Sequence, residues 1–205
     1  MTNHQNFKVN PEIAWGVDSV ALRQLHPITE DAVMRKTWCL HKFLDRAHPN
    51  RLAHALRAGA PRSNFARFLT ETPMVIHGNC LLNEGINELF TLIAGTGAVK
   101  WDSGNAYTGV GDSATAADAG QTALQAAGNK LYVAMDGGYP TYGSSQKATW
   151  RSSFAAAQAN FAWAEITVSN TSGGDTGKNL NRKVQAMGTK ASPAVWTPSL
   201  EISLT

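Results

Sequence analysis

Two pairs of side chains are the first candidates for chemistry in this sequence. Cys39 and His41 stand two residues apart, and His77 and Cys80 stand three apart. Two thiolates and two imidazoles could bind zinc tetrahedrally, and a Cys-His pair could form a nucleophile. Helical signals surround the first pair, however, and on a helix Cys39 and His41 lie about 200° apart. We therefore expect buried thiols and hydrogen-bonded histidines, with no metal site and no catalytic residue.

Two glycine-rich stretches imitate phosphate-binding loops. Residues 109–114 read GVGDSA, which has the shape of a dinucleotide fingerprint, but Asp112 stands where the phosphate charge would arrive. Residues 173–179 read GGDTGKN, in which Asn179 replaces the Ser or Thr needed for magnesium. We predict no cofactor: the first stretch is expected to be a glycine turn after a strand, and the second a hairpin tip.

Three aspartates, Asp102, Asp112 and Asp118, lie in a loop rich in Gly, Ala and Ser and could bind calcium. The calcium loop of an EF-hand is absent, because no Glu follows at its closing position. We interpret the aspartates as turn residues and solubilising charge. No group of residues in the sequence forms an active site, so the sequence predicts a protein that is not an enzyme.

The chain has 205 residues, of which 43% are hydrophobic, so it can bury a core in one domain or in one domain with an arm. No apolar run reaches the roughly 18 residues of a membrane span. The first ten residues lack the apolar core of a signal peptide. We expect a protein without a membrane-bound part that folds in a cytoplasm.

Basic residues are concentrated in the first part of the chain. Residues 1–77 hold ten Lys or Arg against six Asp or Glu, a formal charge of +4, and residues 78–205 hold eight against nine, a charge of -1. The run comprises Arg35, Lys36, Lys42, Arg46, Arg51, Arg57, Arg62 and Arg67. It is a set of solvated faces, a protein contact or a nucleic-acid site. Nucleic acid is the least favoured, because no base-reading motif accompanies the charge.

Helical signals follow the N-terminal stretch of residues 1–77. A first helix is predicted from the N-cap Thr29 to Ala47, a second from the cap Asn50 to Leu56, and a third from Ser63 over Phe65 and Phe68. Three short helices enclose little core. Residues 1–77 are therefore expected to form a helical or extended arm that packs on the rest of the chain or on another subunit.

The period of the sequence changes in residues 78–205. One helix is predicted over 82–93 by helical spacing, and after Gly97 the apolar residues alternate with period two. The strands are predicted at 106–110, 130–135, 146–154, 161–170, 181–187 and 196–205. Such strands, separated by turns, predict a mainly β protein: an antiparallel β-sandwich, jelly-roll-like or immunoglobulin-like, in residues 78–205.

This second region resembles a family of virion structural proteins from tailed double-stranded DNA bacteriophages. The stretches that carry the resemblance are CLLNEGINELFTLIAGTG, YTGVGDSATAADAGQTALQ, NKLYVAMDGGYP, TWRSSFAAAQANFAWAEITVSN, LNRKVQAMGTK and WTPSLEISLT. The resemblance implies a non-enzymatic protein of the virion, assembled in the bacterial host cytoplasm, with the major capsid protein or other virion proteins as partners. It gives no catalytic residues to transfer.

A capsid decoration (cement) protein that stabilises the shell is the favoured function, and a homo-oligomer, preferably a trimer, is expected because shells offer many local threefold axes. A tail, neck or tail-fibre component is the alternative, and a DNA-binding virion protein is a further one. The residues expected to contact the partner are Trp15, Trp38, Phe43, Arg46, Arg51, Arg57, Arg62, Phe65, Arg67 and Phe68. Aromatic anchors and arginines are the residues that dominate protein interfaces.

Overall fold

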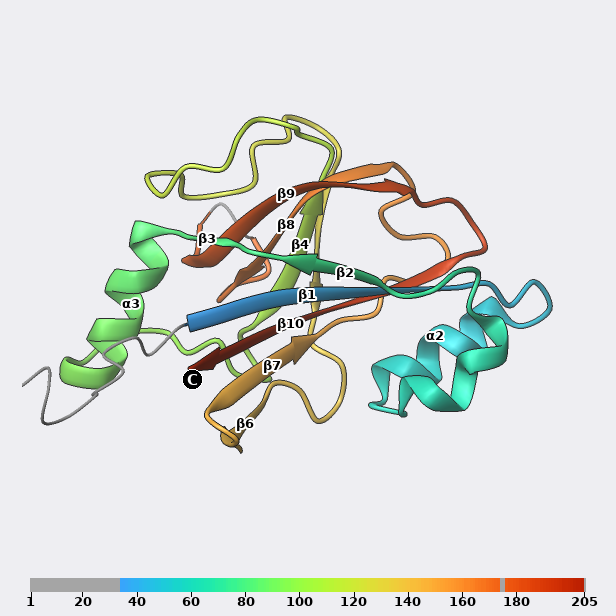
Figure 1. Cartoon of the computed structure of the whole chain (residues 1–205), viewed down its shortest axis with the longest axis horizontal. Coiled ribbons are helices and arrows are strands. Elements are labelled where there is room, and N and C mark those ends of the chain that lie inside the picture. Colours follow the sequence, from blue (N-terminus) through green and yellow to red (C-terminus); the bar gives the residue numbers. More distant parts are fainter. Residues whose placement is uncertain (1–33, 174–175, 205) are drawn as a thin grey trace, which may run out of the picture. The chain divides into compact units, whose positions relative to one another are not determined.

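Two antiparallel sheets of five strands each make up the computed structural model, which describes residues 34–173 and 176–204 (Figure 1). Sheet A has the order β2-β1-β10-β7-β6, and sheet B has the order β3-β9-β8-β4-β5. In chain order the elements are β1 (Met34–Phe43), α2 (Pro49–Arg57), the 3-10 helix η1 (Arg62–Phe68), β2 (Met74–His77), β3 (Cys80–Leu81), α3 (Asn83–Ala94), β4 (Tyr107–Gly111), β5 (Lys130–Ala134), β6 (Thr141–Ser144), β7 (Lys147–Arg151), β8 (Ala162–Ser169), β9 (Asn179–Thr189) and β10 (Val195–Leu204). The prediction of a mainly β, sandwich-like antiparallel architecture is confirmed.

The core lies between the two sheets, and β1, β10, β4 and β8 supply much of it. Trp38 and Leu200 are direct neighbours on β1 and β10 and are 1% and 0% exposed. Val110, Ile166 and Val168 supply the facing side from sheet B and are equally buried. Period-two burial on both sheets is what the alternating apolar residues of these strands predict. β8 is buried on both of its faces, as its large residues on both sides predicted.

The first described strand corrects the sequence prediction. A helix was predicted from Thr29 to Ala47, yet residues 34–43 form β1, which pairs with β10 over its whole length and with β2 over 37–40. Trp38 and Leu40 face the core while Cys39 and His41 are half-buried on the opposite face. Pairing on both edges outweighs the local helical spacing, because strand preference depends mainly on tertiary neighbours. Residues 1–33, including Trp15 and the expected cap Thr29, lie outside the described residues.

The expected boundary after residue 77 falls inside a compact unit that runs from Met34 to Leu204. β1 and β2 belong to the same sheet as β10, β7 and β6. Residues 34–77 therefore pack on the rest of the chain, which is one of the two arrangements expected for them. They are part of the sandwich and do not form an arm.

The two shorter helices were predicted in the right places. α2 begins at Pro49, one residue before the expected cap Asn50, and η1 covers Arg62–Phe68. α2 and η1 pack on the outer face of sheet A, where Phe43, Leu56 and Val195 form a second buried cluster. Phe43 and Val195 are partners across β1 and β10, so this cluster holds α2 against one end of the sheet (Figure 1).

Two buried ion pairs fix irregular segments to the sheets. Arg151 Nε donates to Asp136 at 2.8 Å, and Arg151 Nη2 donates to the Leu56 carbonyl at 2.9 Å, which ties the end of α2 to sheet A. Arg182 Nε donates to Glu165 at 2.7 Å, and both side chains are 0% exposed. This second pair holds the long connection between β4 and β5.

The helix predicted over 82–93 is also present, as α3. The strands predicted from period two are all present, with ends shifted by a few residues. β2, β3 and β6 were not predicted; each spans four residues or fewer. In the part of the chain that the structure describes, no helix is long and apolar enough to cross a membrane.

Candidate functional site

The Cys39 and His41 side chains lie side by side, contrary to the expectation of a helix that separates them. On a strand, residues two apart share a face, and Cys39 Sγ is 3.6 Å from His41 Nδ1. Arg62 Nη1 donates to His41 Nδ1 at 3.0 Å and to Ser199 Oγ at 3.1 Å. The cluster therefore ties η1 to β1 and β10.

The electrostatics of this cluster keep both reactive groups neutral. Burial raises the pKa of the Cys39 thiol, and the Arg62 charge opposes that shift only partly. Burial, followed by the charges of Arg62 and Arg151, lowers the pKa of His41 to about 4. A Cys-His nucleophile needs a thiolate beside an imidazolium, which is the opposite protonation of both groups. The cluster is suited to holding η1 on the sheet.

The second pair, His77 and Cys80, is divided between the sheets. His77 ends β2 in sheet A, and Cys80 begins β3 in sheet B. Within residues 34–173 and 176–204, no three His, Cys, Asp or Glu side chains converge in a way that could hold a metal ion. The two pairs therefore do not form the zinc site that was considered.

The GVGDSA motif has a structural explanation. Gly109 and Gly111 lie within β4, not in a turn after it as expected. A Cβ on Gly109 would come within 2.9 Å of Thr167 Cγ2, and one on Gly111 within 2.9 Å of Ala126 Cβ. The glycines are required because the strand is covered closely on that face, and no phosphate is needed to explain them.

Asp102 and Asp118 act in turns, as predicted, whereas Asp112 accepts a long-range hydrogen bond from Asn129 Nδ2 at 2.8 Å. Asp102 Oδ1 accepts hydrogen bonds from the Gly104 and Asn105 amides, each at 3.0 Å. Asp118 Oδ1 accepts one from the Gly120 amide at 2.8 Å. These are the short-range bonds by which aspartate fixes a turn.

The aromatic residues expected to contact a partner are used inside the molecule. Trp38 and Phe43 are 1% and 0% exposed and belong to the two cores, so they are not available as anchors. Phe65 and Phe68 are half-buried against the cluster below α2. The sequence signal was ambiguous because an aromatic residue serves a core and an interface equally well.

The arginines expected at the same contact do not form one site. Arg57 donates to the Ser153 carbonyl at 3.1 Å and to Gln158 Oε1, and Arg62 is held by the His41 cluster. Arg67 lies over the Phe68 ring, 4.7 Å from its centroid. Arg46 and Arg51 are exposed. Four members of the basic run, Lys42, Arg57, Arg62 and Arg67, thus make internal contacts.

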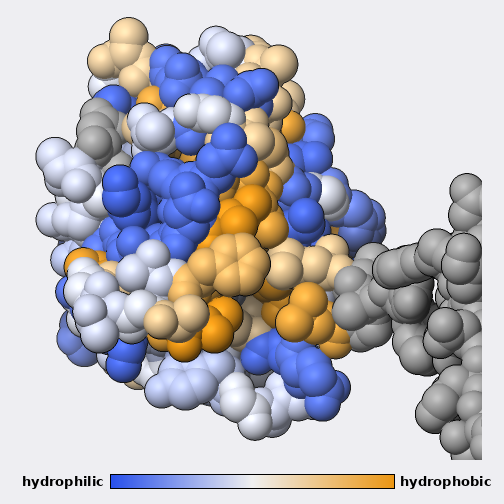
Figure 2. Space-filling view, turned by 90° about the vertical axis from the view of Figure 1, so that its left-hand side faces the viewer, coloured by the Kyte–Doolittle hydropathy of each residue, from blue (hydrophilic) through white to orange (hydrophobic). Residues whose placement is uncertain are grey.

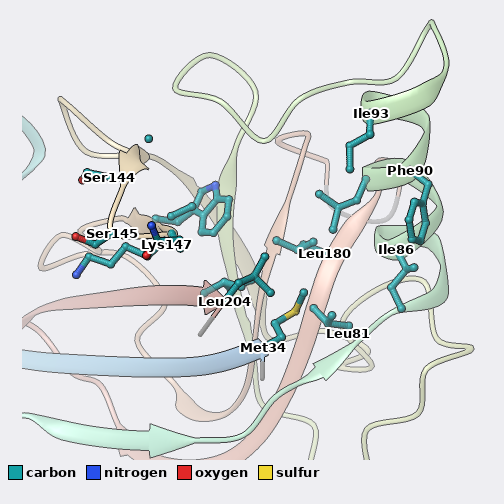
Figure 3. A pocket seen from close by; sticks show the side chains of 16 residues that line it. Met34, Leu81, Ile86, Phe90, Ile93, Ser144, Ser145, Lys147, Leu180 and Leu204 are labelled. Carbon is teal, nitrogen blue, oxygen red and sulfur yellow. The ribbon is translucent and has the colours of Figure 1, made fainter. Parts of the chain in front are cut away.

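A large apolar groove, here called the α3 groove, opens at one end of the sandwich and has a volume of about 820 Å³ (Figure 3). Ile86, Phe90 and Ile93 of α3 form one wall, and Ser144, Ser145 and Lys147 of the β6–β7 hairpin form the other. Between them lie Met34, Leu81, Leu180 and Leu204, from the ends of strands of both sheets. The groove is therefore the place where the core between the sheets reaches the surface.

The position of α3 creates the groove. Gly85 sits directly on β9, because a Cβ there would lie 2.6 Å from both Cα and O of Leu180. This backbone contact fixes the first turn of α3, and Leu89 and Leu92 of the later turns pack against the core. Phe90 is 64% exposed and Ile93 is 78% exposed. Figure 2 shows apolar residues gathered in a band on this side of the molecule, between hydrophilic regions.

The groove has almost no charge of its own. Among the described residues that line it, Lys147 alone is charged, and its Nζ lies 3.1 Å from Glu201 Oε2. A ligand would therefore be bound through apolar contacts and shape. Sequence reasoning missed this site because the apolar spacing of residues 82–93 predicts a helix but does not tell which of its side chains are covered. Of these residues, Leu82 is fully buried, while Phe90 and Ile93 are exposed.

Apolar exposure of this extent is typical of a docking surface. Comparisons with protein-family models, with curated proteins and with solved structures find no match for this chain.

Proposed function

We propose that the protein is a non-enzymatic structural component of a bacteriophage virion, and specifically a capsid decoration protein that binds and stabilises the shell of the major capsid protein. The α3 groove carries this proposal, because it is a preformed apolar surface with Phe90 and Ile93 exposed beside it. Burying such a surface is the main source of free energy in protein association. The resemblance of residues 78–205 to phage virion proteins supplies the kind of partner.

Two properties of the structure support a binding role. The end of α2 and the β4–β5 connection are held by the buried pairs Arg151–Asp136 and Arg182–Glu165, so these segments are fixed before the protein meets a partner. Rigidity lowers the entropy that binding must overcome. The neutral thiol and imidazole of Cys39 and His41 also favour a structural role for that cluster over a catalytic one.

Stabilisation of a shell would follow from mass action. A protein that binds only to the assembled shell shifts the equilibrium between assembled and separated subunits toward the assembled state. Repeating a modest contact over many lattice positions multiplies this effect, and a second contact from the same copy adds avidity. A homo-oligomer, with a trimer as the favoured state, would match the local threefold axes of a shell.

The experiment that tests this function is the copy number of the chain in purified virus particles, measured by quantitative mass spectrometry against the major shell protein. A ratio of this chain to the major shell protein that matches the number of equivalent positions on the shell lattice supports decoration of the capsid. A few copies per particle would move the protein to the tail, neck or fibres. Absence from the particles would end the virion proposal.

A groove variant tests the mechanism separately. Ile93→Asp places a charge in the groove at a side chain that is 78% exposed, so the fold is retained. Val75→Asp on β2, at a side chain that is 53% exposed, is the matched control. We expect Ile93→Asp to lose attachment to particles that lack the protein, while Val75→Asp attaches as the wild type does. Equal attachment of both variants would show that the groove is not the contact.

A further inference from the structure

The α3 groove contains the start of the described chain. Met34, the first residue of β1, lines the groove and pairs with Leu204 of β10, which lines it as well. The segment of residues 1–33 is thus joined to the chain at a residue that lines the groove. We propose that the groove receives the N-terminal segment, residues 1–33, of a second copy of this chain. The proposal rests on the proposed function, because it names the contact between copies in the assembly.

The length of the segment is sufficient for this exchange. Thirty-three residues precede Met34. In an extended conformation they span up to about 100 Å, and roughly ten residues cover 30 Å, so the segment can reach a neighbouring copy and lie along its groove.

The composition of the segment matches the groove. Its apolar residues include Phe7, Val9, Ile13, Trp15, Val17, Val20, Leu22, Leu25 and Ile28. It carries Lys8 and Arg23 against four acidic residues, Glu12, Asp18, Glu30 and Asp31. The charged group of the groove, Lys147, is already paired with Glu201. Binding would therefore be selected by apolar contact, with Trp15 as the largest anchor.

The position of Met34 favours a neighbouring copy as the source of the segment that binds in the groove. The groove and Met34 belong to the same surface, together with the exposed Phe90 and Ile93. When copies meet through this surface around a closed symmetry axis, the segment of each copy starts beside the groove of its neighbour. Each contact between the surfaces then brings a segment and a groove together, and mutual exchange covers apolar area that is exposed in a single copy.

Photocrosslinking in the full-length chain tests the proposal. p-Benzoyl-phenylalanine replaces Phe90, and light and 15N-labelled copies are mixed in equal amounts, dissociated in urea and refolded together. We expect crosslinked peptides from residues 1–33, and about half of the crosslinked pairs should combine a light with a heavy peptide, as random pairing requires. The same probe at Val75, which is also exposed, is expected to give no crosslinks to residues 1–33.

Three outcomes would overturn the proposal. If every crosslinked pair joined two light peptides or two heavy peptides, the segment would lie in the groove of its own copy. Crosslinks to residues outside 1–33 would indicate a different occupant, such as the α3 face of another copy. A monomeric mass by light scattering at all concentrations would exclude exchange. None of these outcomes depends on virus particles, whereas a failed copy-number measurement would refute the virion function and leave the exchange intact.

Discussion

Replacing Arg182 by methionine tests whether a buried ion pair organises the long connection between β4 and β5. Arg182 donates to Glu165 and also to the carbonyl oxygens of Thr115 and Ala116, at 2.9 and 3.2 Å. Glu165 in turn accepts from the amides of Gln125 and Ala126, at 2.9 and 2.7 Å. The pair thus holds the connection at two points.

The size of the effect follows from burial. Both side chains are 0% exposed, so Arg182→Met leaves the Glu165 carboxylate in the interior without its counter-charge. Removing one partner of a buried pair costs about 3 to 5 kcal/mol, out of a typical total of about 5 to 15 kcal/mol. At about 2 to 4 °C per kcal/mol for a chain of this size, the melting temperature should fall by roughly 6 to 20 °C.

Urea unfolding followed by tryptophan fluorescence measures the loss, and subtilisin digestion reports whether residues 112–129 are released. A double variant, Arg182→Met with Glu165→Met, is the matched control, because it removes both charges and leaves none uncompensated. We expect the double variant to regain most of the free energy of unfolding while its connection stays open to protease. A single variant within about 1 kcal/mol of the wild type would refute the reasoning.

Three further predictions concern other parts of the molecule. Gly85→Ala should lower the free energy of unfolding by about 1 to 3 kcal/mol, because the added Cβ would overlap the backbone of Leu180. Urea unfolding measures this loss. The pKa of His41 is 6.5 in an unfolded chain and about 4 in the folded protein, so between these pH values only the unfolded chain is protonated there. The free energy of unfolding should therefore fall as the pH falls from 6.5 to about 4. His41→Gln should reduce that slope in unfolding curves measured at each pH, and an unchanged slope would contradict the assignment. Burial raises the pKa of Cys39, so iodoacetamide should modify this thiol more slowly in the folded protein than in urea, as followed by mass spectrometry.

The sequence predicted those elements whose residues signal their own structure. The alternation of Trp196, Leu200, Ile202 and Leu204 indicated β10 correctly because one face of that strand meets the core or the groove. α2 was predicted from the cap Asn50 to Leu56, within one residue of its observed ends at Pro49 and Arg57. Capping residues and apolar spacing are local properties, and they act in the same way in any fold.

β1 was mispredicted because its structure is decided far away in the sequence. Cys39 lies 160 residues from Ser199, its partner on β10. The sequence predicts the start of a helix from the residue types of Thr29, Glu30 and Asp31. No residue near Trp38 indicates that the partner strand lies far away in the sequence. The error reached the candidate site as well, since a helix separates Cys39 from His41 and a strand places them on one face.

The α3 groove was beyond sequence reasoning for a related reason. The stripe Leu82, Ile86, Leu89, Phe90 and Ile93 predicts a helix with an apolar side, and it does so correctly. Periodicity does not tell how far a sheet extends beneath that side. Leu89 and Leu92 pack against the core, while Phe90 and Ile93 on the same helix stay exposed.

The place of β10 between β1 and β7 has a consequence for synthesis of the chain. Both β1 and β7 precede β10 in the sequence, so among the described strands they have no common neighbour until β10 has been synthesised. Sheet A is therefore completed later than its β1–β2 and β6–β7 pairs, and one edge of β1 and one edge of β7 stay unpaired until then. A chain that stops before Val195 would keep the pairings of sheet B and lose the strand that joins the two halves of sheet A. Such a chain would lack Ile202 and Leu204 in the α3 groove, and β10 would no longer connect β1 to the β6–β7 hairpin that forms one wall of the groove.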